Sequence, residues 1–126
     1  MISNHPPHFA IIGAGTAGLA TAILLARQNI QVSILEKASE LEPVGAGLLL
    51  QPSGLAVFEH LGLLDEVLRL GAKVTGLKGQ LPSGNLLVNS HYQQAHPDFY
   101  GVGIHRATLC HVLENKCREY SELITW

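Results

Sequence analysis

The first part of the chain changes from a strand pattern to a helix pattern and back. His8 to Ile12 contains a short, unbroken apolar run, which predicts a buried parallel strand. From Ala17 to about Gln28 apolar residues recur four positions apart, which predicts a helix with one apolar face. Gln31 to Leu35 predicts a second strand. Together these elements predict a βαβ unit over residues 8–36, about as long as a right-handed crossover requires.

The middle of the chain alternates between loop and helix patterns. Glu40 to Gln51 is rich in small residues and is expected to be a loop. Pro52 and Ser53 predict the start of a helix that Gly62 ends, and Asp65 to Leu70 predicts a short helix that Gly71 stops. The apolar face of the first of these helices is expected to carry Leu55, Phe58 and Leu61.

The last part of the chain predicts a hairpin, a helix and a strand. Val74 to Ser90 contains two extended runs around the turn sequence Leu81 to Gly84, which predicts a β-hairpin. From about Arg106 to Tyr120 apolar residues recur three and four positions apart, which predicts an amphipathic helix, and Glu122 to Trp126 is β-like. The fold class is therefore α/β, with a Rossmann-like βαβ unit and a β-hairpin insertion.

The glycine pattern adds a candidate chemistry to the βαβ unit. Gly13-Ala14-Gly15-Thr16-Ala17-Gly18 matches G-x-G-x-x-G between the predicted strand and helix, where backbone N–H groups and the helix dipole can hold a pyrophosphate. Glu36 follows the second strand, where a carboxylate accepts hydrogen bonds from an adenosine ribose and repels a 2′-phosphate. These residues predict a dinucleotide site that disfavours NADP and leaves FAD and NAD open. The alternative is an ordinary strand-helix turn with a solvated Glu36.

Composition limits the other function classes. The 126 residues are 47% hydrophobic and suffice for one domain or part of one, and a net charge of -2 without a basic block makes nucleic acid an unexpected partner. Phe9 to Ala26 carries no charge, but three glycines interrupt it and no Lys or Arg precedes it, so we expect no integral membrane segment.

The cysteines and histidines suggest neither a disulfide nor a metal site. Cys110 and Cys117 lie seven positions apart on a predicted helix, about 10 Å by helical rise and beyond disulfide reach. Reduced thiols fit a cytoplasmic protein. The seven histidines show no metal-ligand spacing and are expected to be scattered over surfaces and loops: His5, His8, His60, His91, His96, His105 and His111.

Three segments, in order and spacing, resemble the start of FAD-dependent monooxygenases of the aromatic-ring hydroxylase (p-hydroxybenzoate hydroxylase-like) family. They are AIIGAGTAGLATAILLARQNIQVSILEK, VGAGLLLQPSGLAVFEHLGLLDEV and GIHRATLCHVL. The family usually has Gly at the position of Asn29, where Asn tolerates the left-handed conformation that ends a helix. The resemblance favours FAD over NAD.

The resemblance also implies site residues. The turn from Gly13 to Gly18, with Glu36 and Lys37, would hold the ADP half of FAD. Arg106 and the loop from Gly45 to Leu48, with Gly47 and Leu48, would lie nearer the ribityl chain or flavin.

The reaction that the resemblance implies is hydroxylation of a small, often aromatic, substrate with NAD(P)H and O₂. No residue is assigned as a catalytic acid or base, and the oligomeric state stays open. The alternatives are another FAD-dependent oxidoreductase, of reductase or halogenase type, and a non-catalytic nucleotide-binding fragment.

The resemblance places the whole chain, residues 1–126, in the N-terminal part of an FAD-binding domain. The later Asp-Gly and Gly-Asp motifs of the family do not occur, and family members are roughly three times as long. We therefore expect a truncated domain that has no hydroxylase activity alone and leaves the apolar face around Leu109 and Leu113 partly uncovered.

Overall fold

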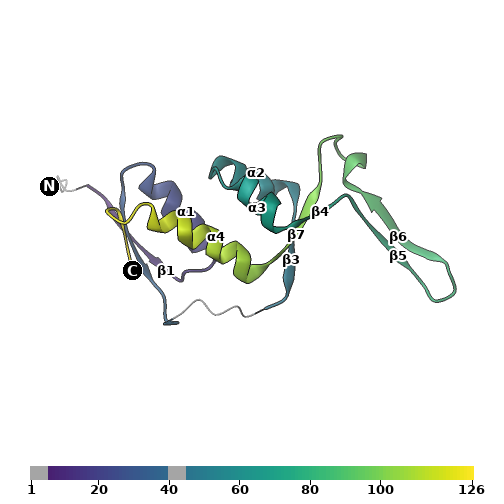
Figure 1. Ribbon diagram of the computed structural model, residues 1–126, viewed down its shortest axis with the longest axis horizontal. Helices are drawn as coiled ribbons and strands as arrows, with labels where there is room; N and C mark the ends of the chain where they lie inside the picture. Colours follow the sequence, from purple (N-terminus) through teal and green to yellow (C-terminus); the bar gives the residue numbers. More distant parts are fainter. Residues whose placement is uncertain (1–5, 40–44) are drawn as a thin grey trace. The chain divides into compact units, whose positions relative to one another are not determined.

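The computed structural model describes residues 6–39 and 45–126, and these form two compact units. The described residues of the first unit are 6–39, 45 and 106–126, and the second unit comprises residues 46–105. Figure 1 shows both units and labels most of their elements. Those of the first are β1 (His8–Ile12), α1 (Thr16–Ala26), β2 (Gln31–Leu35), α4 (Arg106–Arg118) and β8 (Ile124–Thr125). Those of the second are β3 (Gly47–Leu50), α2 (Pro52–His60), α3 (Leu64–Leu70), β4 (Ala72–Val74), β5 (Gly76–Gln80), β6 (Leu86–His91), η1 (Tyr92–Gln94) and β7 (Gly101–His105).

The first unit contains a parallel sheet in the order β1-β2-β8, with α1 and α4 packed side by side (Figure 1). The βαβ unit is therefore confirmed. Asn29 ends the crossover helix with φ 56°, the left-handed conformation that the sequence predicts there. Leu109 and Leu113 are buried, so the prediction that their face is partly uncovered is wrong: α4 lies against α1, which covers it.

The prediction that β1 is buried is also wrong. β1 lies at the edge of the sheet, and most of its residues are exposed, whereas Val32 and Ile34 of the central strand β2 are buried. Ile12 pairs with Leu35, so the two side chains lie on the same face of the sheet. They are 81% and 52% exposed, which shows that this face has no cover among the described residues.

The second unit is built on an antiparallel sheet in the order β3-β7-β4, packed against α2 and α3. Its core holds the three residues predicted for the apolar face of α2, together with Val67, Val102 and Ile104. Gly62 follows α2 with φ 69°, and Gly71 follows α3, as the sequence predicts. At Gly71 glycine is needed for space, because a Cβ would clash with Val102.

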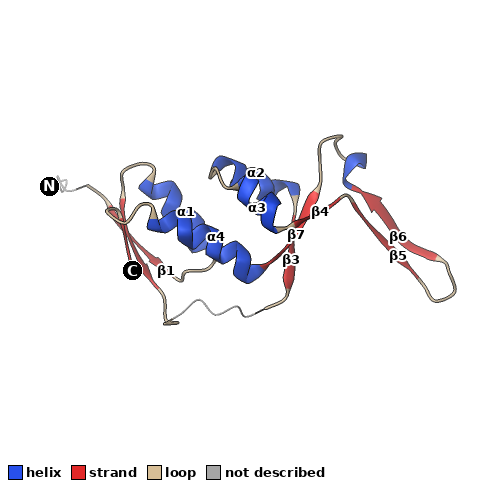
Figure 2. Ribbon diagram, viewed as in Figure 1, coloured by secondary structure: helices blue, strands red, loops and turns tan. Residues whose placement is uncertain are grey.

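The predicted hairpin is confirmed as β5 and β6, which form a separate two-stranded ladder (Figure 2). Its turn is closed by the Gly84 N–H, which donates to the Leu81 carbonyl at 2.8 Å. The loop predicted from Glu40 to Gln51 is wrong in part. Residues 47–50 form β3, because a partner far along the chain, β7, satisfies their backbone hydrogen bonds. Residues 40–44 of that loop lie outside the described residues.

Candidate functional site

The glycine-rich turn joins β1 to α1 at the carboxyl end of the parallel sheet. Gly13 has φ 99°, a conformation that glycine adopts without strain, and its N–H donates to the Leu35 carbonyl at 2.7 Å. Gly18 allows the helix to approach the strand, because a Cβ there would clash with the Gly13 carbonyl oxygen. The turn therefore has the geometry that the motif predicts for its outer glycines.

Gly15 lies at the position where a ligand could approach the backbone. It precedes α1 in an extended conformation, and a Cβ added there would meet no atom within 4 Å. The N–H groups of Thr16, Ala17 and Gly18 belong to the first turn of α1 and have no partner four residues earlier in the helix. Open space thus lies beside backbone donors at the positive end of the helix dipole, which suits a pyrophosphate.

The Glu36 side chain lies against this turn. The Ala14 N–H donates to its Oε2 at 2.7 Å, and the Ala38 N–H donates to its Oε1 at 3.0 Å. These two hydrogen bonds, first Ala14 and then Ala38, hold the pKa of Glu36 below its usual range, with smaller contributions from the backbone and charge of Lys37. An ionised carboxylate has about four acceptor positions, so Glu36 can accept further hydrogen bonds from a ribose.

The residues predicted near the ribityl chain or flavin are divided between the two units. In the first unit, the Arg106 side chain passes Gly45, where an added Cβ would lie 3.9 Å from Arg106 Cδ. Arg106 is exposed and forms no hydrogen bond or ion pair with a residue that the structure describes. Its charge is therefore available to a ligand.

Gly47 and Leu48 lie in the second unit, opposite His105 and Ile104 of β7. All four line a shallow hollow of about 700 Å³, and Gly103 lines it as well. Glycines in this lining leave the backbone accessible. The sequence predicted Gly47 and Leu48 but missed the strand that carries them and the hollow that they line.

The structure brings together the predicted residues of the turn, Gly13, Ala14, Gly15, Thr16, Ala17 and Gly18, with Glu36 and Lys37. Three or more potential metal ligands do not come together anywhere in residues 6–39 and 45–126. Cys110 and Cys117 are both free thiols. No helix within the same ranges has the length and apolar character needed to cross a membrane.

A second polar group, which sequence analysis missed, lies between β3 and the hairpin. The Tyr92 hydroxyl donates to Gln51 Oε1 at 2.8 Å across 41 positions of sequence. Tyr92 lies in none of the segments that carry the family resemblance, and Gln51 lies in one without an assigned role, so only the pairing of β3 and the hairpin's position could have revealed the contact.

Comparison with known proteins finds relatives that are hydroxylases or monooxygenases by name. 3-Hydroxybenzoate 6-hydroxylase of Klebsiella oxytoca is 38% identical over 104 residues, which are 79% of this chain and 26% of the relative. 3-Amino-4-hydroxybenzoate 2-monooxygenase of Streptomyces cremeus is 38% identical over 69 residues, which are 55% of this chain and 18% of the relative. The chain thus spans about a quarter or less of these relatives.

Solved structures show the same architecture. The crystal structure of Pseudomonas aeruginosa PqsL in complex with 2-aminobenzoylacetate has a TM-score of 0.85 and 28% identity, over 94% of this chain and 33% of that one. The α/β, Rossmann-like fold is therefore confirmed, as is the resemblance to FAD-dependent aromatic hydroxylases. The family model described as FAD binding domain matches residues 8–117, and the chain belongs to this family.

Proposed function

We propose that this chain binds the ADP half of FAD and forms the N-terminal part, residues 1–126, of the FAD-binding domain of a flavin-dependent monooxygenase. The observation that carries the proposal is the open space at Gly15, between unpartnered N–H groups of α1 and the Glu36 carboxylate. A pyrophosphate needs close approach to backbone donors, and an adenosine ribose needs an acceptor nearby. Both requirements meet within one turn.

In this proposal each predicted residue has a physical role. Gly13 and Gly18 shape the turn, Ala14 holds Glu36 beside the cofactor through its N–H, and Gly15, Thr16 and Ala17 present their backbone to the pyrophosphate. Glu36, with Lys37 beside it, receives the ribose hydroxyls. Arg106, Gly47 and Leu48 contact the ribityl chain or flavin, where the guanidinium offers charge and the glycine offers backbone.

The proposed reaction is hydroxylation of a small aromatic substrate with NAD(P)H and O₂. FAD, when bound, supplies the redox chemistry, and the protein supplies binding and orientation. The names of the two relatives describe enzymes that act on hydroxylated benzoates, which supports an aromatic substrate. Since the chain spans only 26% of the first relative, the activity is proposed for the protein that carries this domain. NAD(P)H as reductant rests on the same resemblance, and a cytoplasmic location rests on the two free thiols.

The test is substitution of Gly15 by Val, followed by titration with FAD and with ADP-ribose. The added side chain would occupy the approach to the backbone, and loss of one or two charge-assisted hydrogen bonds should weaken binding on the order of a hundred-fold. Circular dichroism checks the fold, which should persist because no atom lies within 4 Å of the added Cβ. Unchanged affinity in a folded variant would overturn the proposed site.

A further inference from the structure

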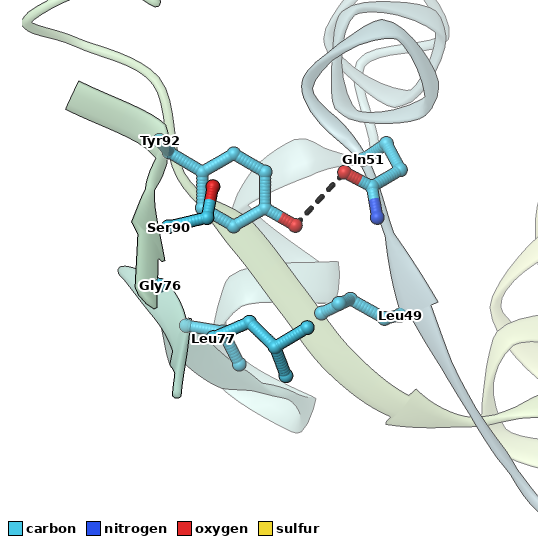
Figure 3. A pocket seen from close by; sticks show the side chains of 7 residues that line it. Leu49, Gln51, Gly76, Leu77, Ser90 and Tyr92 are labelled. Carbon is cyan, nitrogen blue, oxygen red and sulfur yellow. Dashed lines mark hydrogen bonds between the residues drawn. The ribbon is translucent and has the colours of Figure 1, made fainter. Parts of the chain in front are cut away.

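The second unit contains a hollow of about 230 Å³ between the end of β3, the end of β4 and the β5–β6 hairpin (Figure 3). Three apolar side chains line it: Leu49, Val74 and Leu77. Three polar side chains line it as well: Gln51, Ser90 and Tyr92. An apolar wall with a few polar groups at one place is the usual composition of a small-molecule site.

The polar groups of this hollow are oriented before any ligand arrives. In Figure 3 the Tyr92 hydroxyl points at Gln51, to whose Oε1 it donates at 2.8 Å. This bond fixes the direction of the Gln51 amide and leaves both of its N–H donors unpaired among the described residues. It also uses the only proton of the Tyr92 hydroxyl, whose oxygen then remains as an acceptor.

Two glycines allow the side chains to take these positions. At Gly101 an added Cβ would lie 2.7 Å from Tyr92 Oη and 3.0 Å from Leu49 Cδ1, so the tyrosine ring and the leucine both rest on the bare backbone of β7. At Gly76 an added Cβ would lie 2.5 Å from the Ser90 carbonyl oxygen, which shows how closely the hairpin strands approach there. The hollow and its polar pair therefore depend on glycine at both positions.

Size and charge limit the ligand. The volume is below the roughly 300–1,000 Å³ of sites for drug-sized molecules but above the roughly 150 Å³ that accepts benzene, which indicates a single ring. None of the described residues that line the hollow carries a charge. A carboxylate placed there would lose hydration without gaining a cation, whereas a phenol hydroxyl needs only one donor and one acceptor.

We propose that this hollow binds the phenolic hydroxyl end of a single-ring aromatic substrate, an inference that rests on the proposed function. The Gln51 amide donates to the phenol oxygen, and the phenol O–H donates to Tyr92 Oη or Ser90 Oγ. The ring lies against Leu49, Val74 and Leu77. Tyr92 thereby acts both as a ligand contact and as the residue that orients Gln51.

The experiment is a nuclear magnetic resonance titration of the purified protein with phenol, toluene and benzoate. Phenol should shift the Gln51 side-chain amide and the backbone amides of Leu77 and Ser90, and benzoate should bind more weakly. Gln51→Leu and Tyr92→Phe each remove one hydrogen-bonding group and should weaken phenol binding about two- to ten-fold. Toluene binding should stay unchanged in both variants. Leu87→Ser is the matched control, because Leu87 lies on the same hairpin, is 67% exposed and does not line the hollow.

Two results would overturn the inference: phenol shifts confined to other residues, or equal phenol affinity in the wild type, Gln51→Leu and Tyr92→Phe. FAD titration of the same samples separates this inference from the proposed function. FAD binding without phenol binding would overturn the phenol site and leave the cofactor site standing. Phenol binding at the hollow without FAD binding would support the hollow and contradict the proposed function.

Discussion

The Glu36 carboxylate and the Ala14 N–H are joined by a 2.7 Å hydrogen bond between the end of β2 and the glycine-rich turn. The bond joins two residues 22 positions apart in the sequence and holds the acidic group beside the donors of α1. The other oxygen of the Glu36 carboxylate accepts a hydrogen bond from the Ala38 N–H. A carboxylate restrained at both oxygens keeps a fixed direction for its remaining acceptor positions, which favours binding of a diol such as ribose.

Substitution of Glu36 by Gln should change ligand preference as well as affinity. Gln keeps an oxygen for the Ala14 N–H but loses the negative charge, so ADP-ribose should bind about ten-fold more weakly. Adenosine 2′,5′-bisphosphate should bind better than it does to the wild type, because the repulsion of its 2′-phosphate is removed. Isothermal titration with both ligands measures the ratio of their affinities. An equal ratio in the wild type and the variant would show that Glu36 only supports the turn.

The same carboxylate should make stability depend on pH in the acid range. Its pKa in the folded chain lies below the ordinary value of 4.5, chiefly because of the Ala14 hydrogen bond. A depressed pKa means that the contribution is present above the ordinary value and is lost as pH falls through the folded value. Urea unfolding of wild type and Glu36→Gln from about pH 7 to about pH 3 should therefore show a difference that shrinks only in acid. A constant difference would contradict this.

The glycines of the turn should differ in what they contribute to folding. Gly18→Ala places a Cβ against the Gly13 carbonyl oxygen, a backbone atom that cannot move away cheaply, and should cost about 1–3 kcal/mol or more in the free energy of unfolding. Gly15→Ala is the matched control, since its Cβ meets nothing and its φ is -73°. Denaturant unfolding of both variants should rank Gly18→Ala as clearly less stable, and equal stability would argue against close strand–helix packing at Gly18.

The βαβ unit could be predicted because its determinants are local. The apolar periodicity of the helix, the glycine spacing and the position of Asn29 are all features of one continuous stretch of chain. The φ of 56° at Asn29 follows from the need to end α1 before β2. The exposure of β1 could not be predicted in the same way. The apolar run of β1 has the composition of a buried strand, yet burial depends on neighbours, and among the described residues β1 has a partner strand on one side only.

The second unit is harder to predict from the sequence, because its contacts join residues that are distant along the chain. β3 and β7 pair Gly47 with His105 and Leu50 with Val102, so neither strand is stabilised by residues next to it in the chain. A run of leucines after a glycine-rich segment resembles a loop as much as a strand. The hydrogen bond between Tyr92 and Gln51 depends on the pairing of β3 with β7, so sequence motifs alone do not predict it.

The two cysteines should report separately on the native state and on unfolding. Cys117 is fully buried, its Sγ lies 3.6 Å from the Leu19 carbonyl oxygen, and burial, followed by the charge of Glu114, raises the pKa of this thiol to about 11. Burial also raises the pKa of Cys110, while the charge of Arg106 lowers it, and this thiol is partly accessible. Because the thiolate is the reactive species, a disulfide reagent at neutral pH should label Cys110 in the folded protein and leave Cys117 unlabelled.

Labelling of a Cys110→Ala variant isolates the buried thiol. Its reaction should be absent without denaturant and should appear along the same urea transition as the loss of helical circular dichroism, since α4 must leave α1 before the reagent can reach Cys117. A Cys117→Ala variant provides the matched control, with labelling of Cys110 before unfolding. Rapid labelling of Cys117 without denaturant would show that the contact between α1 and α4 opens in the native state, and the proposed FAD-binding turn at the start of α1 would then rest on a mobile helix pair.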